Sequence, residues 1–181
     1  MSTPTDTSSL ANLTAINYLD ENGKLPTELS GKVGVYAIFD QTKVLQFVGY
    51  SRDVYLSLKQ HLVRQPQNCY WLKVQTIEKP NRTFLENTMN NWIAENGTIP
   101  VGNDTDKTKW TDPIDVKLLM SDEEKANYEK VTGEELAQSK VLKKVARRVE
   151  AEILETLKNR HYQEEIRFNP KLKESGLLDL K

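Results

Sequence analysis

The sequence predicts an α+β fold in which a small three-stranded antiparallel sheet is flanked by helices. Residues 33–39 carry apolar side chains on both alternating faces, which is typical of a central strand covered on two sides. Residues 44–48 form a second apolar run after a short polar turn, and a turn this short predicts an antiparallel hairpin. Two helical patterns and a third strand follow within residues 51–96, so these elements can share one hydrophobic core.

The first helical pattern begins near Ser51, whose hydroxyl can cap a helix that runs to about Arg64. Its apolar residues recur at the spacing of one helix face: Val54, Leu58 and Leu62. Residues 71–77 then alternate in the manner of an edge strand. Pro80 opens the second helix, because a missing N–H costs nothing at the first helical position, and Gly97 ends it.

The rest of the chain divides around this central domain of residues 31–105. Residues 1–30 are predicted to be a leader, in which residues 1–9 are disordered and apolar residues within 10–19 form a short amphipathic helix. Residues 106–181 form an extension. It contains a short strand over residues 114–120, a helix that a capping box at Ser121 begins, and a long amphipathic helix over residues 134–161.

The long helix over residues 134–161 needs a cover for its apolar stripe. Either the protein's own domain or a second copy, in a homodimer, can supply that cover. The first half of this helix is rich in Lys and Arg, and the second half is rich in Glu. The basic half can alternatively follow a nucleic-acid backbone.

Composition and charge limit the classes of function. The formal net charge of −1 over 181 residues gives no overall attraction to nucleic acid, so a phosphate-binding surface would need locally concentrated Lys and Arg. Cys69 is the only cysteine, which excludes an intrachain disulfide and fits a reducing compartment. No apolar run approaches a membrane span, and the first residues lack the basic and apolar regions of a secretory signal. We therefore expect a cytoplasmic protein.

Two tripeptides of the hairpin, Gly34-Val35-Tyr36 and Phe47-Val48-Gly49, resemble the two signature motifs of the GIY-YIG nuclease family. The order of the later elements strengthens the resemblance, because a helix near Ser51, a strand near Trp71 and a helix with Leu85-Glu86-Asn87 follow. The sequence is similar to the amino-terminal GIY-YIG domain of plastid monothiol glutaredoxins, which also has an FVG-type tripeptide followed by a Ser-Arg pair. The resemblance covers roughly residues 30–105 and implies the α+β fold of that family.

Three residues match positions that act in the family. Tyr36 matches the tyrosine that helps to activate the attacking water, although it can also be an ordinary buried strand tyrosine. His61 matches a position where relatives carry His or Tyr, and it can relay a proton, contact phosphate or only pack. Glu86 matches the carboxylate that holds Mg²⁺ or Mn²⁺; alternatively, it completes a capping box begun by Thr83.

Other matching positions depart from the family pattern. Phe47 replaces the second tyrosine and loses its hydroxyl, and Ser57 replaces the catalytic arginine, whose fixed donors steady phosphoryl charge. Arg52 and Lys59 lie nearby as candidates to replace this arginine, and we assign the catalytic role to Arg52, although an exposed arginine there can equally have no role. We assign substrate binding to Phe47, Lys59 and Asn103, of which Asn103 is explained equally well by a Gly-Asn turn.

These residues lead to alternative functions. We expect Tyr36, His61 and Glu86 to converge on one concave surface, with Arg52 or Lys59 at its edge. The first hypothesis is a metal-dependent endonuclease that acts on DNA, with weak cleavage because of the missing arginine. The second is a non-catalytic module that binds nucleic acid or protein. Since the plastid relatives join this domain to a glutaredoxin, a glutaredoxin-type partner with a link to iron–sulfur functions is a third hypothesis.

Overall fold

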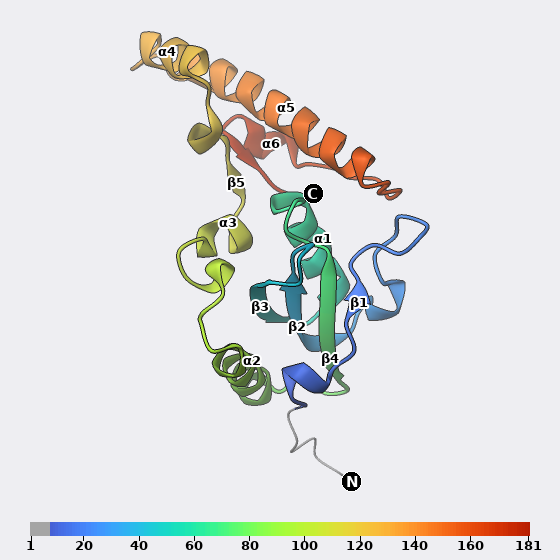
Figure 1. The fold of residues 1–181 in the computed structure, drawn as a ribbon. Coiled ribbons are helices and arrows are strands. Elements are labelled where there is room, and N and C mark those ends of the chain that lie inside the picture. The colour runs from blue at the N-terminus through green and yellow to red at the C-terminus, as the bar shows by residue number, and fades with distance from the viewer. Residues whose placement is uncertain (1–7) are drawn as a thin grey trace. The chain divides into compact units, whose positions relative to one another are not determined.

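The computed structural model describes residues 8–181, so the disorder expected for residues 1–7 concerns positions outside this range. The chain divides into two compact units, the first ending at Thr111 and the second covering Asp112–Lys181. Each unit has its own sheet and its own helices (Figure 1). The α+β class and the helical carboxy-terminal part predicted from the sequence are both confirmed.

The first unit is built on an antiparallel sheet with the strand order β1-β4-β2-β3. Its helices and strands are η1 Leu10–Asn12, β1 Ile16–Asn17, η2 Thr27–Leu29, β2 Val33–Phe39, β3 Leu45–Ser51, α1 Val54–Arg64, β4 Trp71–Ile77, α2 Arg82–Asn96, η3 Val101–Asn103 and α3 Lys107–Thr111. The predicted hairpin is present, with Tyr36 opposite Gly49 in the register of β2 and β3.

The central strand β2 is covered on both faces, as its two apolar sets of positions predict. Val35 and Ala37 belong to a buried cluster that includes Leu85 and Trp92 of α2. Side chains alternate across a strand, so Tyr36 points to the other face, where it meets α1. The two helices therefore lie on opposite faces of one sheet, and β3 forms its edge.

The amphipathic helix predicted within residues 10–19 is wrong. Only Leu10–Asn12 form a short 3₁₀ turn, and Ile16 pairs with Leu72 as the fourth strand, β1. A helix of fewer than ten residues is marginal by itself, so the pairing with β4 and the burial of Leu10 decide the conformation. This extra strand also covers part of β4, which was predicted as an edge strand.

Both helices of the first unit begin two residues later than the sequence indicated. Asp53 is the N-cap of α1 and accepts a hydrogen bond from the Leu56 N–H, whereas Ser51 still belongs to β3. Asn81 caps α2 by accepting from the Phe84 N–H, so Pro80 precedes that helix. Asp and Asn cap as well as Ser does, and nothing local ranks them. Glu86 consequently lies in the second turn of α2 and takes no part in a capping box.

The second unit consists of β5 Ile114–Asp115, η4 Val116–Leu119, α4 Asp122–Lys130, α5 Glu135–Asn159, α6 Pro170–Lys173 and β6 Leu177–Leu178. Strands β5 and β6 pair antiparallel, and Ser121 forms the predicted capping box of α4 with Glu124. The predicted strand over residues 114–120 is shorter than expected, because it continues as the 3₁₀ helix η4.

The apolar stripe of α5 is buried within the second unit. Leu142, Val145, Ala146, Val149 and Leu157 are almost fully buried. Elements η4, α4, α6 and β6 pack on this helix, so these five residues are covered without a second copy of the chain, whereas Leu154 remains 39% exposed. None of the described helices is both long and apolar enough to span a bilayer.

Candidate functional site

A hollow of about 580 Å³ lies around the β3 edge of the sheet in the first unit. Its lining comes from both faces of the sheet and from α3, and it includes Tyr36, Phe47, Val48, Gly49, Tyr50, Ser57, Gln60, His61, Arg64, Met89, Asn90, Ile93, Ile99, Asn103, Lys107 and Thr111. Five of the residues that the sequence singled out lie in this hollow: Tyr36, Phe47, Ser57, His61 and Asn103.

Tyr36 and His61 form a buried hydrogen-bonded pair. The Tyr36 hydroxyl lies 2.7 Å from His61 Nε2, and the two residues are only 3% and 4% exposed. Burial lowers the pKa of His61 to about 3, and the positive charge of Arg64 acts in the same direction, while the Trp110 carbonyl opposes them. Burial also raises the pKa of the Tyr36 hydroxyl above its usual range. Both groups are therefore uncharged at neutral pH.

Aromatic rings surround this pair. Phe47 stacks on Trp110, with ring centroids 5.4 Å apart and planes within 2°, and it lies 4.7 Å from the His61 ring. Trp110 belongs to α3 and is itself 1% exposed. Phe47 has no hydroxyl to bring to the hollow, so it supplies packing and low polarity at this point.

Gly49 is required by the close approach of Tyr36. A Cβ atom at position 49 would lie 2.7 Å from Phe47 Cε1 and 2.9 Å from the Tyr36 hydroxyl. The tyrosine ring thus passes over the strand where the opposite residue has no side chain, in accord with the register of β2 and β3. The glycine of the second tripeptide serves to seat the tyrosine of the first.

Ser57 adds a hydroxyl beside the pair. Its Oγ lies 2.7 Å from the Ser51 Oγ, and its hydrogen bonding partly offsets the rise in the Tyr36 pKa. On α1, residues 57, 61 and 64 follow one another at the i, i+4, i+7 spacing of one helix face. Ser57 is therefore in the hollow, at the position where the family pattern would have an arginine.

Asn103 binds the edge of the sheet through its side-chain amide. Its Nδ2 donates to the Val48 carbonyl at 2.7 Å, and its Oδ1 accepts from the Val48 N–H at 2.8 Å. The amide thus uses a donor and an acceptor for the backbone while the residue lines the hollow. This geometry gives Asn103 a positioning role, since it fixes the loop before α3 against β3.

Glu86 is not among the residues that line the hollow. Its Oε1 accepts from the Arg82 Nε at 2.7 Å and from the Tyr50 hydroxyl at 3.1 Å, and these bonds lower its pKa. Tyr50 packs against the cluster on the α2 face, so Glu86 lies on the other side of the sheet from Tyr36. The expected convergence of Glu86 with Tyr36 and His61 is not seen, although Tyr50 connects Glu86 to the rim of the hollow.

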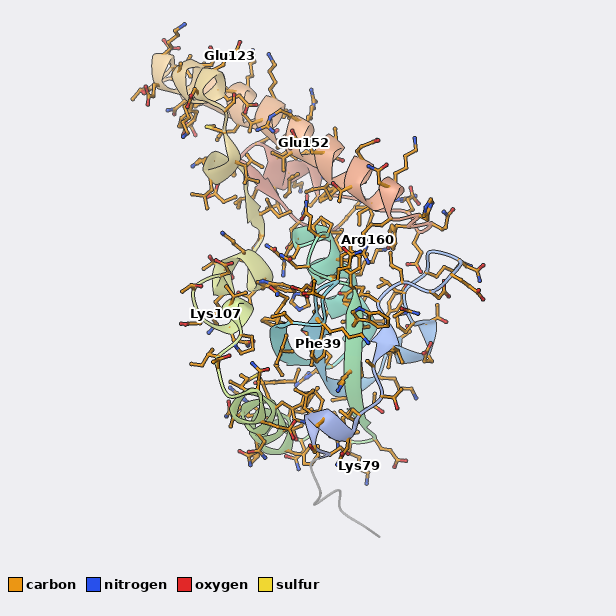
Figure 2. All side chains as sticks on the ribbon, in the orientation of Figure 1. Phe39, Lys79, Lys107, Glu123, Glu152 and Arg160 are labelled. Carbon is orange, nitrogen blue, oxygen red and sulfur yellow. The ribbon has the colours of Figure 1, made fainter. Side chains whose placement is uncertain are left out.

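The cations of the hollow differ from those proposed. Arg52 lies in the bend before α1 and Lys59 lies on another face of that helix, and neither lines the hollow. Arg64 and Lys107 do; the Arg64 Nη1 donates to the Trp110 carbonyl at 3.1 Å, and Lys107 is the first residue of α3 (Figure 2). The spacing of Arg64 from Ser57 and His61 is a helical signal that would have indicated it. No comparable signal exists for Lys107 or Trp110.

Metal binding at Glu86 would use few protein ligands. Over residues 8–181 no group of three or more His, Cys, Asp and Glu side chains is arranged to hold a metal ion. Glu86 is ionised, and its Oε2 has no hydrogen bond to the described residues, so one carboxylate oxygen is open to a cation. This donor set fits Mg²⁺, which keeps most of its waters and needs few protein ligands.

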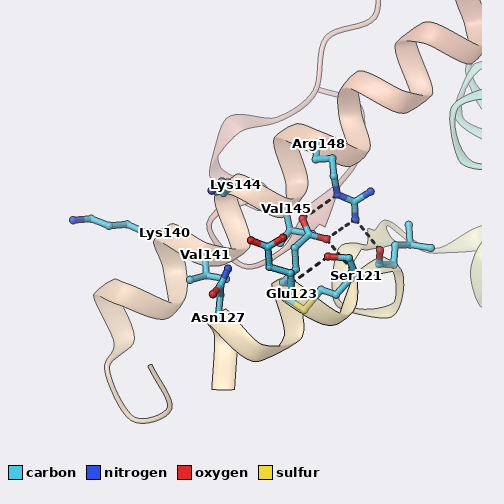
Figure 3. A pocket seen from close by; sticks show the side chains of 11 residues that line it. Ser121, Glu123, Asn127, Lys140, Val141, Lys144, Val145 and Arg148 are labelled. Carbon is cyan, nitrogen blue, oxygen red and sulfur yellow. Dashed lines mark hydrogen bonds and ion pairs between the residues drawn. The ribbon is translucent and has the colours of Figure 1, made fainter. Parts of the chain in front are cut away.

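The second unit has a separate hollow between η4, α4 and α5 (Figure 3). There Arg148 binds Glu124 through two hydrogen bonds, of 2.9 Å from Nε and 2.7 Å from Nη2, and also donates to the Leu119 carbonyl. These contacts join α4 to α5. Lys140 and Lys144 lie at the margin of this hollow, and Val141 and Val145 line it.

Comparison with known proteins gives a partial match. The chain is 35% identical over 97 residues to the bifunctional monothiol glutaredoxin-S16, chloroplastic, of Arabidopsis thaliana. The match takes in 49% of this chain and 33% of that protein, so the chain spans only about a third of the relative. No protein-family model matches the chain. The similarity supports a relationship to part of a plastid monothiol glutaredoxin.

Proposed function

We propose that the first unit is a GIY-YIG-type domain that binds DNA at the hollow and hydrolyses a phosphodiester slowly. The buried pair of Tyr36 and His61 carries this proposal. It places an acid–base pair at the floor of a hollow that also contains two cations, Arg64 and Lys107. A phosphate drawn in by these cations would lie beside the tyrosine hydroxyl.

The chemistry assigns a role to each member of the pair. Neutral His61 accepts the Tyr36 proton at Nε2 while the Tyr36 oxygen takes a proton from the attacking water. The water oxygen forms the new bond to phosphorus, the bond to the leaving oxygen breaks, and the leaving oxygen is protonated from solvent. His61 then releases the proton at Nε2 to solvent, which balances the proton that the leaving oxygen took up, and the pair is restored with the former water proton on the Tyr36 oxygen. Because its pKa is about 3, His61 is a weak base, which limits the rate.

A divalent cation fits beside Glu86, whose free Oε2 would hold Mg²⁺ or Mn²⁺ together with water molecules. When bound, such an ion supplies electrostatic stabilisation of phosphoryl charge and activation of a water molecule. Glu86 keeps its negative charge because Arg82 and Tyr50 lower its pKa. Tyr50 lines the hollow and donates its hydroxyl proton to Glu86, which itself lies outside the lining.

A cleavage assay on supercoiled and branched DNA with Mg²⁺ or Mn²⁺ tests the proposal. We expect Tyr36→Phe to lower cleavage at least about 100-fold, since it removes the hydroxyl that carries the proton. Glu86→Gln should lower the metal-dependent rate without unfolding the domain. Tyr128→Phe, in α4 of the second unit, is the matched control and should cleave like the wild type. Full activity of Tyr36→Phe would place the activity elsewhere or in a contaminant.

The similarity to a bifunctional monothiol glutaredoxin favours a second candidate function. In this case the domain is a non-catalytic module that acts with a separate glutaredoxin-type partner in iron–sulfur handling. Phe47 and Ser57 support it, because they remove the hydroxyl and the guanidinium of the nuclease pattern. Direct binding of a purified monothiol glutaredoxin, measured by calorimetry in the absence of DNA cleavage, would favour this function. A homodimer through α5 would have to use the exposed side of the helix, which carries Leu136 and Leu154 among its charged residues, since the buried part of the apolar stripe is already covered.

A further inference from the structure

The hollow in the first unit has two chemically different sides. One side carries the cations Arg64 and Lys107 next to the Tyr36–His61 pair. The other side is formed by Met89, Ile93 and Ile99, with the exposed amide of Asn90 among them. Ile99 is 60% exposed although it is a large apolar residue. Met89 and Ile93 are partly buried against the core of the first unit, so a phosphate group alone would use the cationic side and leave the exposed Ile99 uncovered.

The depth of the pair restricts how a phosphodiester can reach it. Tyr36 and His61 are almost fully buried, so a reacting phosphate must enter the hollow and cannot remain on a convex surface. In a duplex, the base attached to that phosphate is paired and stacked, and extracting it costs a few kcal/mol. An unpaired nucleotide enters without that cost. Its base then needs an apolar surface with hydrogen-bonding groups, which the α2 side of the hollow provides.

We propose that the hollow binds one unpaired nucleotide of a single-stranded or branched DNA, with its phosphate at Arg64 and Lys107 and its base against Ile93 and Ile99. This inference rests on the proposed function, because it names the substrate class of the same site. The volume of about 580 Å³ exceeds what a phosphate group requires and leaves room for a sugar and a base. Asn90 supplies one donor and one acceptor to the edge of the base.

Binding of a labelled oligothymidylate and of a blunt duplex of equal length, measured by fluorescence anisotropy without divalent metal, tests this inference. The wild type should bind the single strand more tightly than the duplex. Ile99→Ala should weaken single-strand binding about fivefold or more by removing apolar contact, and should leave duplex binding unchanged. Leu56→Ala is the matched control, because Leu56 is an exposed leucine on α1, 55% exposed, that does not line the hollow.

A second pair of variants separates the two sides of the hollow. Lys107→Met should weaken the binding of both the oligothymidylate and the duplex, since it removes a contact to phosphate. Lys109→Met, on the same helix but outside the hollow, should bind both like the wild type. Equal affinity of the wild type for both ligands, or an equal loss for both with Ile99→Ala, would overturn the inference.

The outcomes distinguish this inference from the proposed cleavage. If single-strand preference and its loss with Ile99→Ala are found but no DNA is cut under any divalent metal, the nucleotide site stands and the cleavage proposal fails. If cleavage depends on Tyr36 but the variants of the apolar side bind normally, the nucleotide site fails and the cleavage proposal stands.

Discussion

The two faces of the sheet in the first unit hold their polar groups in opposite ways. On the α1 face, Tyr36 and His61 are buried and uncharged among aromatic rings. On the α2 face, Glu86 is charged, has a side chain that is 40% exposed, and is held by the exposed Arg82. Packing holds the buried Tyr36–His61 pair in place, whereas the exposed Glu86 is held only by hydrogen bonds that water can replace. A proton-transfer pair can therefore be preorganised on one face while a cation-binding carboxylate stays accessible on the other.

Removal of the Trp110 side chain, which packs on the α1 face, should have the largest effect on the free energy of unfolding. Trp110 is 1% exposed and stacks on Phe47, so Trp110→Ala leaves a cavity beside the buried pair. We expect a loss of about 3–5 kcal/mol in the free energy of unfolding, measured by urea denaturation with circular dichroism. Ile99→Ala, at an exposed site of the same hollow, should change it little. A loss below about 1 kcal/mol for Trp110→Ala would show that packing does not hold the α1 face.

Acidification should destabilise the α1 face at a higher pH than the α2 face. The pKa of His61 is lowered by burial from its usual 6.5 to about 3, so the unfolded chain binds more protons between these values. The contribution of uncharged His61 to the free energy of unfolding is fully present above pH 6.5 and is lost as the pH falls. The expected loss is about 2 kcal/mol between pH 7 and pH 5 and about 4 kcal/mol by pH 3. The pKa of Glu86 is lowered from 4.5, so its contribution to the free energy of unfolding is lost only as the pH falls below 4.5.

The free energy of unfolding measured from pH 7 to pH 5 isolates this contribution, because the carboxylates remain ionised there. In His61→Gln the free energy of unfolding should change little between pH 7 and pH 5. A variant that keeps the full wild-type slope would mean that another group is responsible and that His61 is solvated.

An arginine installed on the α1 face should raise cleavage, if the proposed nuclease activity exists. Ser57 lines the hollow beside Tyr36, and Ser57→Arg would bring the donors that the nuclease pattern has there. We expect an increase of about 10- to 100-fold, which is smaller than the 100- to 1,000-fold worth of a fully positioned donor. Lys59→Arg, on another face of α1, is the control. No increase with an intact fold would show that the hollow does not hold the reacting phosphate.

The smallest effect on stability is expected from the α2 face. Arg82 and Glu86 form an exposed ion pair, so Arg82→Ala should leave the free energy of unfolding unchanged within error. The same change releases a competitor for Glu86 and should tighten Mn²⁺ binding, measured by calorimetry or paramagnetic relaxation. Unchanged Mn²⁺ affinity in Arg82→Ala together with unchanged affinity in Glu86→Gln would remove Glu86 as a cation ligand.

The comparison of the two faces also explains what the sequence could predict. The central strand, its hairpin and the two helices α1 and α2 were predictable. Their apolar residues recur at the spacing of strands and helices over residues 33–62 and 82–96, because one side of each element is buried. The family resemblance led us to expect Tyr36 and His61 on one surface, but their hydrogen bond was not predicted from the sequence. The face covered by each helix was not predictable, because no local signal encodes it, and for this reason Glu86 was expected beside Tyr36. Trp110 and Lys107 reach the hollow through a long connection, so only the tertiary fold brings them there.

Asn103 has a consequence for how the protein behaves in solution. Strand β3 is the last of its sheet, and Val48 presents its N–H and C=O outward, where a strand of another molecule would pair. The Asn103 amide occupies both groups and therefore imitates the next strand over one residue. An edge closed in this way resists strand addition and edge-to-edge aggregation. The residue that keeps the hollow in place thus also protects the sheet from self-association.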